Sequence, residues 1–220
     1  MKTFNELQEG VYDPNILKAF FLAGGPGSGK SYVVRQATGG LGMRIINSDT
    51  HFERLLKQAG LSAKMPPEEQ QPRDVVRAKA KELTKLQQKN YLIGRLGLII
   101  DGTGKDFDKI AYQARELESL GYDTHMIFVN TSLDVALQRN KKRDRSVPES
   151  IAVKSWNEVQ RNIGKFSNFF KGNFIIVDNN DVDEDMMFQV FKRVKSLANK
   201  KVQNQRGLQW IRNELEKKKR

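Results

Sequence analysis

The most informative stretch of the sequence is a glycine-rich segment that ends in a lysine and a serine. Residues 24–31 read GGPGSGKS and fit the pattern G-x-x-x-x-G-K-[ST] of a phosphate-binding loop. Glycines allow backbone N–H groups to turn inward around an anion without side chains in the way. We therefore expect nucleotide phosphates to bind against Gly25, Gly27, Ser28 and Gly29.

Lys30 and Ser31 supply the reactive groups at the end of this segment. The Lys30 ammonium can contact the β- and γ-phosphates of ATP and act in catalysis, and the Ser31 hydroxyl can hold Mg²⁺. The sequence predicts a strand over 19–23 and a helix over 31–37, whose positive N-terminal end also favours an anion. A structural glycine turn in an unrelated fold is the alternative, but strand, loop and helix occur in the order that the motif requires. ATP and Mg²⁺ are the predicted cofactors.

Two aspartates follow apolar runs at the points where predicted strands end. In LGLIIDGTG, the Asp101 carboxylate can orient Mg²⁺ through water beside the phosphate loop. In IINSDTHFE, Asp49 can accept a proton from an attacking hydroxyl. The alternatives are a turn or helix cap at Asp101, and an N-cap at Asp49 or Thr50 for the next helix. Thr103 could hydrogen-bond the substrate or cap the helix that follows it.

A cluster of arginines follows the fourth apolar run. The stretch ALQRNKKRDRSVP contains Arg139, Arg143 and Arg145, at the end of a predicted helix and in the loop after it. Arginines here can close over the transferred phosphoryl group and neutralise its growing charge, so all three are candidate catalytic residues. The alternative is a solvated basic turn, which is favourable at a helix C-terminus.

Apolar runs of strand length alternate with helical patterns along the chain. The runs lack the strict alternation of a half-exposed strand, which indicates strands buried on both faces of a parallel sheet. Strands that alternate with helices predict an α/β domain with right-handed crossovers. The runs are 19–23, 43–46, 96–100, 126–129 and 174–177, and the later helices cover 107–120, 133–139 and a long segment that starts near residue 146.

The long helix is predicted from both its start and its apolar face. Ser146 and Glu149 have the spacing of a capping box, with Pro148 in the first turn. Apolar residues then recur at steps of four and three until Gly172, which favours packing on the core over a surface for stacking bases. The residues of this face are Ala152, Trp156, Val159, Ile163, Phe166 and Phe170.

Basic residues are concentrated in two segments. The net charge is +12, and residues 191–220 hold eleven Lys or Arg against two acids, a balance of +9. Residues 50–95 hold ten Lys or Arg against five acids, a balance of +5. Polyanion binding is one interpretation of the tail, and a solvated helix end that keeps the protein soluble is the other.

The expected organisation is one α/β domain over 1–199 and a basic terminal helix or tail over 200–220. The segment 51–95 is long for a single crossover, so we interpret it as a helical insertion on the substrate side, with a helix over 68–90. The expected apolar anchors of the terminal helix are Val202, Leu208, Trp210 and Ile211.

The composition excludes several classes of protein. The chain has no cysteine, which excludes disulfides and cysteine zinc sites and fits a reducing compartment. Acidic residues interrupt the N-terminus where a signal peptide needs an apolar stretch, and the run 19–23 is too short to span a bilayer. A cytoplasmic protein without membrane contact is the expectation. His51 and His125, the only histidines, lack a metal-ligand spacing and are interpreted as structural.

Together these motifs resemble the small P-loop kinases of the zeta-toxin and polynucleotide-kinase group. The resemblance rests on GGPGSGKS, the NSD after the second strand, the DGTG after the third and the arginine-rich segment after VNTSLDVALQRN, and it spans about residues 18–180. It implies an adenylate-kinase-like P-loop NTPase fold, with a five-stranded parallel sheet flanked by helices. It also implies ATP and Mg²⁺ as co-substrates.

The resemblance further implies roles for single residues. Asp49 would be the general base, the arginines named above would stabilise the phosphoryl group, and Asn179, in VDNN after the last strand, would lie near the adenine. Members of the group often carry an arginine three residues after the base, where this sequence has Phe52, with Arg54 two residues further on. Arg54 is therefore a candidate substrate-binding residue.

These features predict an ATP-dependent kinase that transfers the γ-phosphoryl group to a hydroxyl. The two basic segments favour a nucleic-acid acceptor, because a long polyanion can use positive charge that is spread over the surface. A nucleotide sugar is the alternative acceptor. A nucleotide-dependent switch protein that binds nucleic acid is the alternative function. The sequence leaves the oligomeric state open.

Overall fold

The apolar runs of the sequence form the central sheet of the protein. The computed structural model describes residues 10–64, 66–143, 147–181 and 184–219. All strand pairs are parallel and their order is β2-β3-β1-β4-β5, which confirms the predicted five-stranded parallel sheet. The strands are β1 (Lys18–Ala23), β2 (Arg44–Ile46), β3 (Leu98–Asp101), β4 (Asp123–Asn130) and β5 (Phe174–Asp178).

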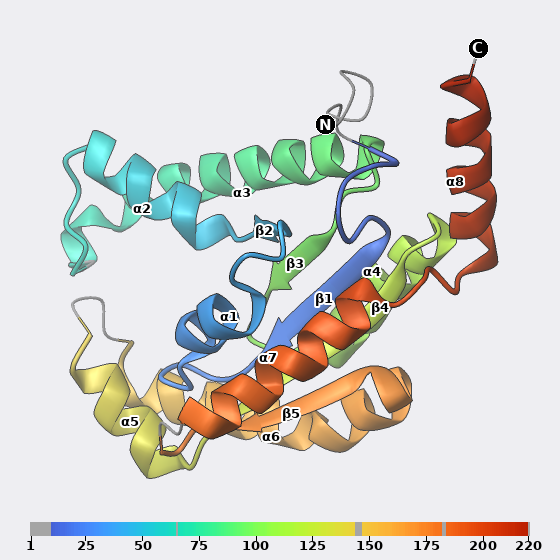
Figure 1. Ribbon diagram of the computed structural model, residues 1–220. Coiled ribbons are helices and arrows are strands. Elements are labelled where there is room, and N and C mark those ends of the chain that lie inside the picture. Colours follow the sequence, from blue (N-terminus) through green and yellow to red (C-terminus); the bar gives the residue numbers. More distant parts are fainter. Residues whose placement is uncertain (1–9, 65, 144–146, 182–183, 220) are drawn as a thin grey trace.

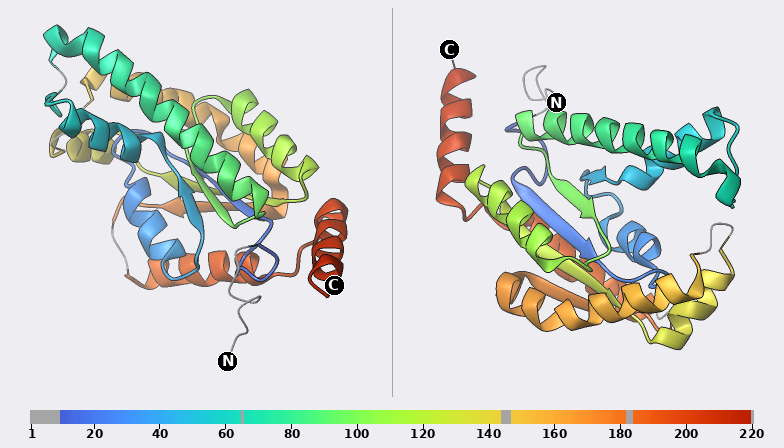
Figure 2. Two further views of the ribbon diagram at one scale, coloured as in Figure 1. Left: turned by 90° about the horizontal axis from the view of Figure 1, so that it is seen from above. Right: turned by 180° about the vertical axis from the view of Figure 1, so that it is seen from behind.

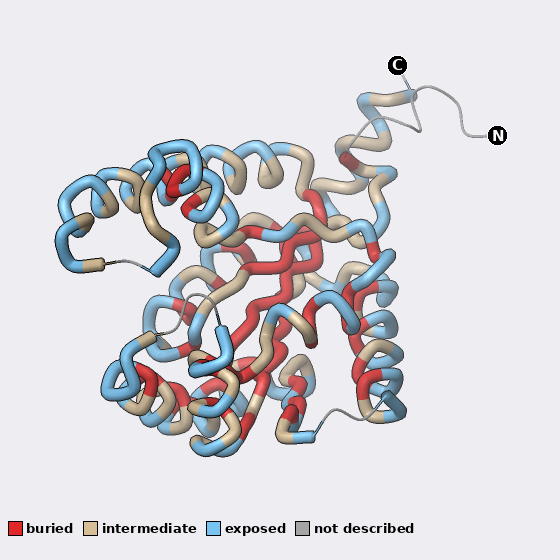
Figure 3. The backbone as a smooth tube through the Cα atoms, turned by 90° about the vertical axis from the view of Figure 1, so that its left-hand side faces the viewer, coloured by how far each residue is buried: buried red, intermediate tan, exposed pale blue. Residues whose placement is uncertain are grey.

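Helices cover both faces of this sheet and give the molecule three layers (Figure 1). One face carries α1 (Lys30–Thr38) and α7 (Glu184–Asn199), and the other carries α4 (Phe107–Ser119) and α6 (Glu149–Phe170) (Figure 2). Buried residues are concentrated in the strands between these layers (Figure 3). Successive residues of β1 therefore point into two separate cores.

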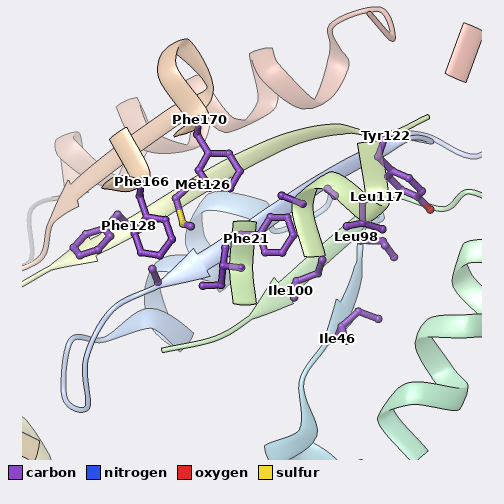
Figure 4. Packing of buried hydrophobic residues seen from close by; sticks show 14 of the residues in the cluster. Phe21, Ile46, Leu98, Ile100, Leu117, Tyr122, Met126, Phe128, Phe166 and Phe170 are labelled. Carbon is purple, nitrogen blue, oxygen red and sulfur yellow. The ribbon is translucent and has the colours of Figure 1, made fainter. Parts of the chain in front are cut away.

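The core on the α4 and α6 side is rich in aromatic rings. Phe21, Phe128, Phe166 and Phe170 pack there in tilted pairs (Figure 4). The predicted packing role of the α6 stripe is thereby confirmed. Trp156, near its start, is half-buried and donates its indole N–H to a backbone carbonyl at 2.9 Å.

The two edge strands correct one prediction. Burial on both faces is expected for every strand, but Ile45 of β2 is 47% exposed and Ile176 of β5 is 52% exposed. Both strands lie at the edges of the sheet, where one face is left partly uncovered by the flanking helices, so the prediction is wrong for them. The central strands β1, β3 and β4 are buried as expected.

Residues 48–93 form a helical unit beside the β2 and β3 edge of the sheet (Figures 1 and 2). It consists of α2 (Ser48–Gln58), the 3₁₀ turn η2 (Pro67–Glu69) and the long α3 (Gln70–Ile93), so the helix predicted over 68–90 is confirmed with a small shift. The two helices pack around a small core of their own, while the outer side of α3 is exposed (Figure 3). The buried residues of this core are Phe52, Leu55, Leu56 and Ala80.

The shorter helices join the layers. Helix α5 (Leu133–Lys141) packs on α6, and the 3₁₀ turn η3 (Lys171–Asn173) leads from α6 into β5. The capping box predicted for α6 includes Ser146, which lies outside the described residues; because α6 begins at Glu149 with Pro148 as its N-cap, the predicted capping box is wrong. Over the described ranges, none of the helices combines the length and apolarity needed to cross a membrane.

Helix α8 (Gln205–Lys217) is attached where β1 and β4 begin, away from their carboxyl ends (Figure 1). The Asp123 carboxylate accepts the backbone N–H groups of residues 203 and 204, each at 3.0 Å. Leu208 is 38% exposed, so its expected role as an anchor is wrong. The partly buried side chains that pack on the sheet core are Val202, Trp210 and Ile211.

Candidate active site

The glycine-rich loop connects β1 to α1 and is enclosed by neighbouring elements. Gly29 is the N-cap of α1 with φ of 82°, and Gly27 has φ of 78°, both in the left-handed region that favours glycine. A Cβ at Gly27 would collide with the Ala136 carbonyl oxygen, and one at Gly29 with the Asn179 side-chain amide. The loop conformation therefore depends on glycine both for its dihedral angles and for this close approach.

Lys30 lies half-buried at the start of α1, where its Nζ donates to the Gly24 carbonyl at 2.6 Å. Burial lowers the pKa of Lys30, and the positive charge of Arg143 lowers that pKa further. The negative charges of Asp101 and Asp49 act in the opposite direction. A phosphate oxygen in place of the neutral carbonyl would form a stronger, charge-assisted hydrogen bond with this ammonium.

Asp101 ends β3, directly beside β1, where it pairs in register with Leu22. Its Oδ2 accepts the Asn47 side-chain N–H at 2.7 Å. Burial raises the pKa of Asp101; the Lys30 charge opposes this shift, and the Asp49 charge adds to it. The fold thus brings Lys30, Asp101 and Asp49 within electrostatic range of one another, although they are far apart in sequence.

Asp49 lies in the first turn of α2, and the prediction that it or Thr50 caps this helix is wrong. The N-cap is Asn47, whose side chain accepts the Asp49 backbone N–H at 2.7 Å. The Asp49 carboxylate accepts instead from the Arg77 guanidinium of α3, with Nη1 and Oδ1 2.7 Å apart. The Arg77 guanidinium carbon also lies 4.0 Å from the centroid of the Phe52 ring.

The candidate lid arginines occupy different environments. Arg139 of α5 donates from both terminal nitrogens to the backbone carbonyls of Asn179 and Asn180, at 2.6 and 2.9 Å, which ties α5 to the segment after β5. Arg143 is exposed in the loop after α5, and its charge acts on Lys30. Arg145 lies outside the described residues. Of the two described lid candidates, Arg139 is therefore held by backbone carbonyls after β5, and Arg143 is exposed near Lys30.

Asn179 and Thr103 border the glycine-rich loop from two sides. Asn179 is buried and donates its side-chain N–H to the Ser28 carbonyl at 2.8 Å. Thr103 is exposed, and its backbone carbonyl accepts the Gly24 N–H at 2.9 Å. The capping alternative for Thr103 is wrong, because Asp106 is the N-cap of α4.

Arg54 does not join these residues. It is exposed on α2, five positions after Asp49, which places the two side chains about 140° apart around the helix. Arg77 and Asn47 instead contact the two candidate acids, and sequence reasoning missed both. The cap position of Asn47 before an apolar helix is a local signal that could have been read, whereas the Arg77 contact spans 28 residues and has no local signature.

A cavity of about 300 Å³ opens beside Asp101, between α3 and the start of α4. Its wall is part apolar and part polar, with uncharged polar side chains from α3 and both basic and acidic side chains from the end of β3, the β3–α4 connection and the start of α4. The polar residues that line it include Ser48, Thr84, Gln88, Asp101, Thr103, Lys105, Lys109 and Gln113. Asp101 lines this cavity, whereas Asp49 is not among its lining residues.

ATP and Mg²⁺ fit the groups assembled here. Among the described residues, Ser28 Oγ and Asn179 Oδ1 are buried polar atoms at the loop without a hydrogen-bond partner, and a bound nucleotide could satisfy them. The Ser31 hydroxyl and the Asp101 carboxylate are hard oxygen donors of the kind that Mg²⁺ takes together with phosphates and water. The described part of the chain has no cluster of three or more His, Cys, Asp or Glu side chains that could enclose a metal ion alone.

The parallel sheet and the glycine-rich loop after β1 define an α/β P-loop NTPase fold. The family model described as zeta toxin matches residues 8–187, and the chain belongs to this family. The resemblance inferred from the motifs is thereby confirmed. A comparison with curated protein sequences gives no match.

Several solved structures share the fold at low sequence identity. A candidate kinase from Chloroflexus aurantiacus j-10-fl has a TM-score of 0.57 and 17% identity, covering 81% of this chain and 97% of that chain. A chain of the PezAT toxin–antitoxin system of Streptococcus pneumoniae has a TM-score of 0.56 and 14% identity, covering 90% and 97%. A chain of the Pnkp1/Rnl/Hen1 RNA repair complex has a TM-score of 0.53 and 18% identity, covering 74% and 49%. These similarities show the common fold.

Proposed function

We propose that this protein is an ATP-dependent kinase that transfers the γ-phosphoryl group to a hydroxyl of its acceptor. The observation that carries the proposal is the placement of Lys30, Asp101 and Asp49 at or just after the carboxyl ends of the three adjacent strands β1, β3 and β2. A purely structural glycine turn needs none of these charges, whereas phosphoryl transfer needs a phosphate-binding cation, a metal-orienting carboxylate and a base.

Each of these side chains has a distinct part in the transfer. The Lys30 ammonium exchanges its hydrogen bond to the Gly24 carbonyl for contacts with the β- and γ-phosphates. Asp49 takes the proton of the acceptor hydroxyl while the hydroxyl oxygen bonds to the γ-phosphorus and the bond from that phosphorus to the β–γ bridging oxygen breaks. The electron pair of the broken bond stays on ADP. Arg143 neutralises negative charge on the moving phosphoryl group.

The metal role falls to Ser31 and Asp101. Mg²⁺, when bound, stabilises negative charge on the β- and γ-phosphate oxygens. Ser31 offers its hydroxyl at the start of α1, and Asp101 offers a carboxylate that the Asn47 amide holds in place at 2.7 Å. The raised pKa of Asp101 would return toward its usual range beside a divalent cation, because the cation favours the ionised carboxylate.

For the acceptor we favour a nucleic-acid hydroxyl, with a nucleotide sugar as the alternative. The net charge of +5 over residues 50–95 supports a nucleic-acid acceptor, because this segment forms most of α2, the helix that carries Asp49, and all of α3, which packs on it. The family membership supports the nucleotide sugar. A cavity of about 300 Å³ is at the small end of ligand pockets and suits one nucleoside or one sugar unit equally.

Transfer of labelled γ-phosphate tests the proposal. We expect a labelled product from one class in a panel of RNA, DNA, nucleosides and nucleotide sugars, and ATP consumption that rises with that acceptor. ATP consumption that no acceptor changes, together with ATP-dependent binding of nucleic acid, would support the switch protein instead. We further propose that 1–199 is the kinase domain, that 200–220 is a basic appendage and that the enzyme acts in the cytoplasm.

A further inference from the structure

Helix α3 carries a regular row of basic side chains. Residues four apart lie on neighbouring turns of a helix, about 40° apart around its axis, so the row winds slowly along α3. From Arg77 to Lys89 it extends about 18 Å at a rise of about 1.5 Å per residue. The α3 row consists of Arg73, Arg77, Lys81, Lys85 and Lys89.

The outer part of the α3 row has no acidic partner in the part of the chain that the structure describes. Lys81, Lys85 and Lys89 are exposed, and none of them makes an ion pair or a side-chain hydrogen bond with another described residue. Residues 73–89 hold six Lys or Arg against two acids. This part of α3 therefore presents uncompensated positive charge along one line.

The inner end of the same row lies in the candidate active site. Arg77 contacts Asp49 at 2.7 Å and lies over Phe52, so its planar guanidinium is held in a defined orientation. Its side chain is still 34% exposed, and a guanidinium has five N–H donors, so it can bind an anion while it contacts Asp49. An acceptor phosphate on Arg77 would place a neighbouring hydroxyl beside the candidate base.

The cavity between α3 and α4 adds further basic and uncharged polar side chains next to the α3 row. Lys105 and Lys109 line it from the α4 side, and Thr84 and Gln88 line it from α3. Basic side chains for phosphates and uncharged polar groups for base edges are parts of a single-strand binding surface, and Asp101 and Asp106 line the same cavity.

We propose that the α3 row and this cavity bind a single strand of nucleic acid, with its terminal hydroxyl at Asp49 and its phosphates along α3. This rests on the proposed kinase function and names the surface that selects the acceptor. A nucleotide sugar has two adjacent phosphates and leaves most of the unpaired part of the row, about 12 Å from Lys81 to Lys89, without a role. A single strand has unpaired bases that can enter the cavity, and a repeated negative charge that matches the row.

Charge neutralisation tests the surface against a matched control. Lys81→Gln, Lys85→Gln and Lys89→Gln are combined in one variant. The control combines Lys192→Gln, Arg193→Gln and Lys195→Gln on α7, which are exposed on the other face of the sheet and change the net charge equally. Binding of a fluorescent twelve-nucleotide strand with a free 5′-hydroxyl is measured by anisotropy at several salt concentrations.

We expect the slope of log K against log[salt] to flatten by about 2 in the α3 variant, because each of the three lost contacts with a single strand contributes about 0.7 to the slope. In the control variant the slope should stay unchanged. The KM for the strand should rise in the α3 variant while the KM for ATP stays the same. Equal slopes in both variants would show that only net charge attracts the strand, and would overturn the inference.

Two further outcomes separate this surface from the kinase proposal. Strand binding that depends on the α3 row, without phosphorylation of any acceptor, would support the surface and reject the kinase function. Phosphorylation of a nucleotide sugar by the wild type, with unchanged KM in the α3 variant and no strand binding at low salt, would support the kinase and overturn the surface.

Discussion

At the scale of single residues, Lys30 is the side chain whose loss should affect catalysis most. Lys30→Ala removes the ammonium that binds the triphosphate, where charge-assisted contacts are the strong ones. Burial already disfavours this charge in the folded protein, so we expect the variant to keep the fold and to lose nearly all transfer. Labelled ATP measures the transfer and circular dichroism the fold. A parental transfer rate would show that the loop does not bind the triphosphate.

Asp49→Asn should affect turnover more than ATP affinity. A general base contributes about 10²- to 10⁴-fold, so we expect kcat to fall in this range with little change in the KM for ATP. Asp49→Asn leaves the cap at Asn47 in place but weakens the ion pair with Arg77, so urea denaturation is measured beside turnover. Asn47→Ala should lower the free energy of unfolding by about 1 kcal/mol through loss of the cap, and it also removes the hydrogen bond to Asp101, so it is compared for stability and not for activity. If Asp49→Asn turns over normally, Asp101 becomes the candidate base.

His125 gives the protein an expected pH dependence of stability. The ring is 3% exposed and stacks on Phe20 at 4.6 Å, and burial, reinforced by the Lys18 charge, lowers the pKa of His125 from 6.5 to about 4. The unfolded chain takes up this proton below about pH 6.5 and the folded protein only near pH 4. Stability should therefore be constant above pH 6.5 and fall on acidification to pH 4, by on the order of 3 kcal/mol.

Urea denaturation between pH 7 and pH 4 measures this loss. His125→Phe should flatten the curve at little cost near pH 7, because neither ring nitrogen has a hydrogen-bond partner among the described residues. An unchanged pH dependence in this variant would assign the effect to other titrating groups.

At the scale of elements, the attachment of α8 depends on a contact between two glycines. A Cβ at Gly207 would collide with the Gly121 carbonyl oxygen, and Val202 and Leu17 crowd the same position. Gly207→Ala should therefore lower the free energy of unfolding by about 1–3 kcal/mol, the usual cost of overpacking. Because α8 lies away from the glycine-rich loop, ATP binding should be unchanged (Figure 1).

Gly164 of α6 is the matched control, since a Cβ there meets nothing within 4 Å. Gly164→Ala should raise the free energy of unfolding by up to about 1 kcal/mol, because alanine favours the helix. Chemical denaturation measures both variants. A loss in both would point to a general intolerance of added volume rather than to the α8 contact.

At the scale of the whole molecule, the basic tail and the candidate active site lie at opposite ends of β1. Helix α8 is attached where β1 begins and the glycine-rich loop follows where it ends, six residues or about 20 Å away. A short acceptor bound at Asp49 should therefore not reach the tail. Neutralising Arg212, Lys217 and Lys219 should flatten the salt dependence of binding for a long single strand and leave that of a trinucleotide unchanged.

This substitution set is a better test than deletion of 200–220, because deletion would uncover the core that Trp210 and Ile211 protect. Anisotropy titrations with the two strand lengths measure the effect. Equal flattening for both lengths would mean that the tail acts only through net charge, and no flattening for either would make it a solubilising appendage.

The sequence by itself determined the parts of this protein whose signals are local. Each of these signals lies within one continuous stretch of sequence, and its residue types reflect the burial and backbone geometry of that stretch. The signals are the GGPGSGKS segment, the apolar runs and the periodic face of α6. The strands, the loop and most helices could therefore be predicted. The exposure of Ile45 and Ile176 could not, because an apolar run has the same appearance in an edge strand and in a central one.

Only the tertiary structure decided which side chains meet. Arg77 reaches Asp49 because α3 packs on α2 through Phe52 and its neighbours, so a distant arginine, and not Arg54 on the same helix, stands beside the candidate base. The sequence makes Arg139 and Arg143 equivalent candidates for contact with the phosphoryl group, but the structure shows that Arg139 is held by backbone carbonyls after β5. Such contacts follow from how buried faces pack, and that packing depends on the whole set of apolar residues and not on the spacing around any one charge.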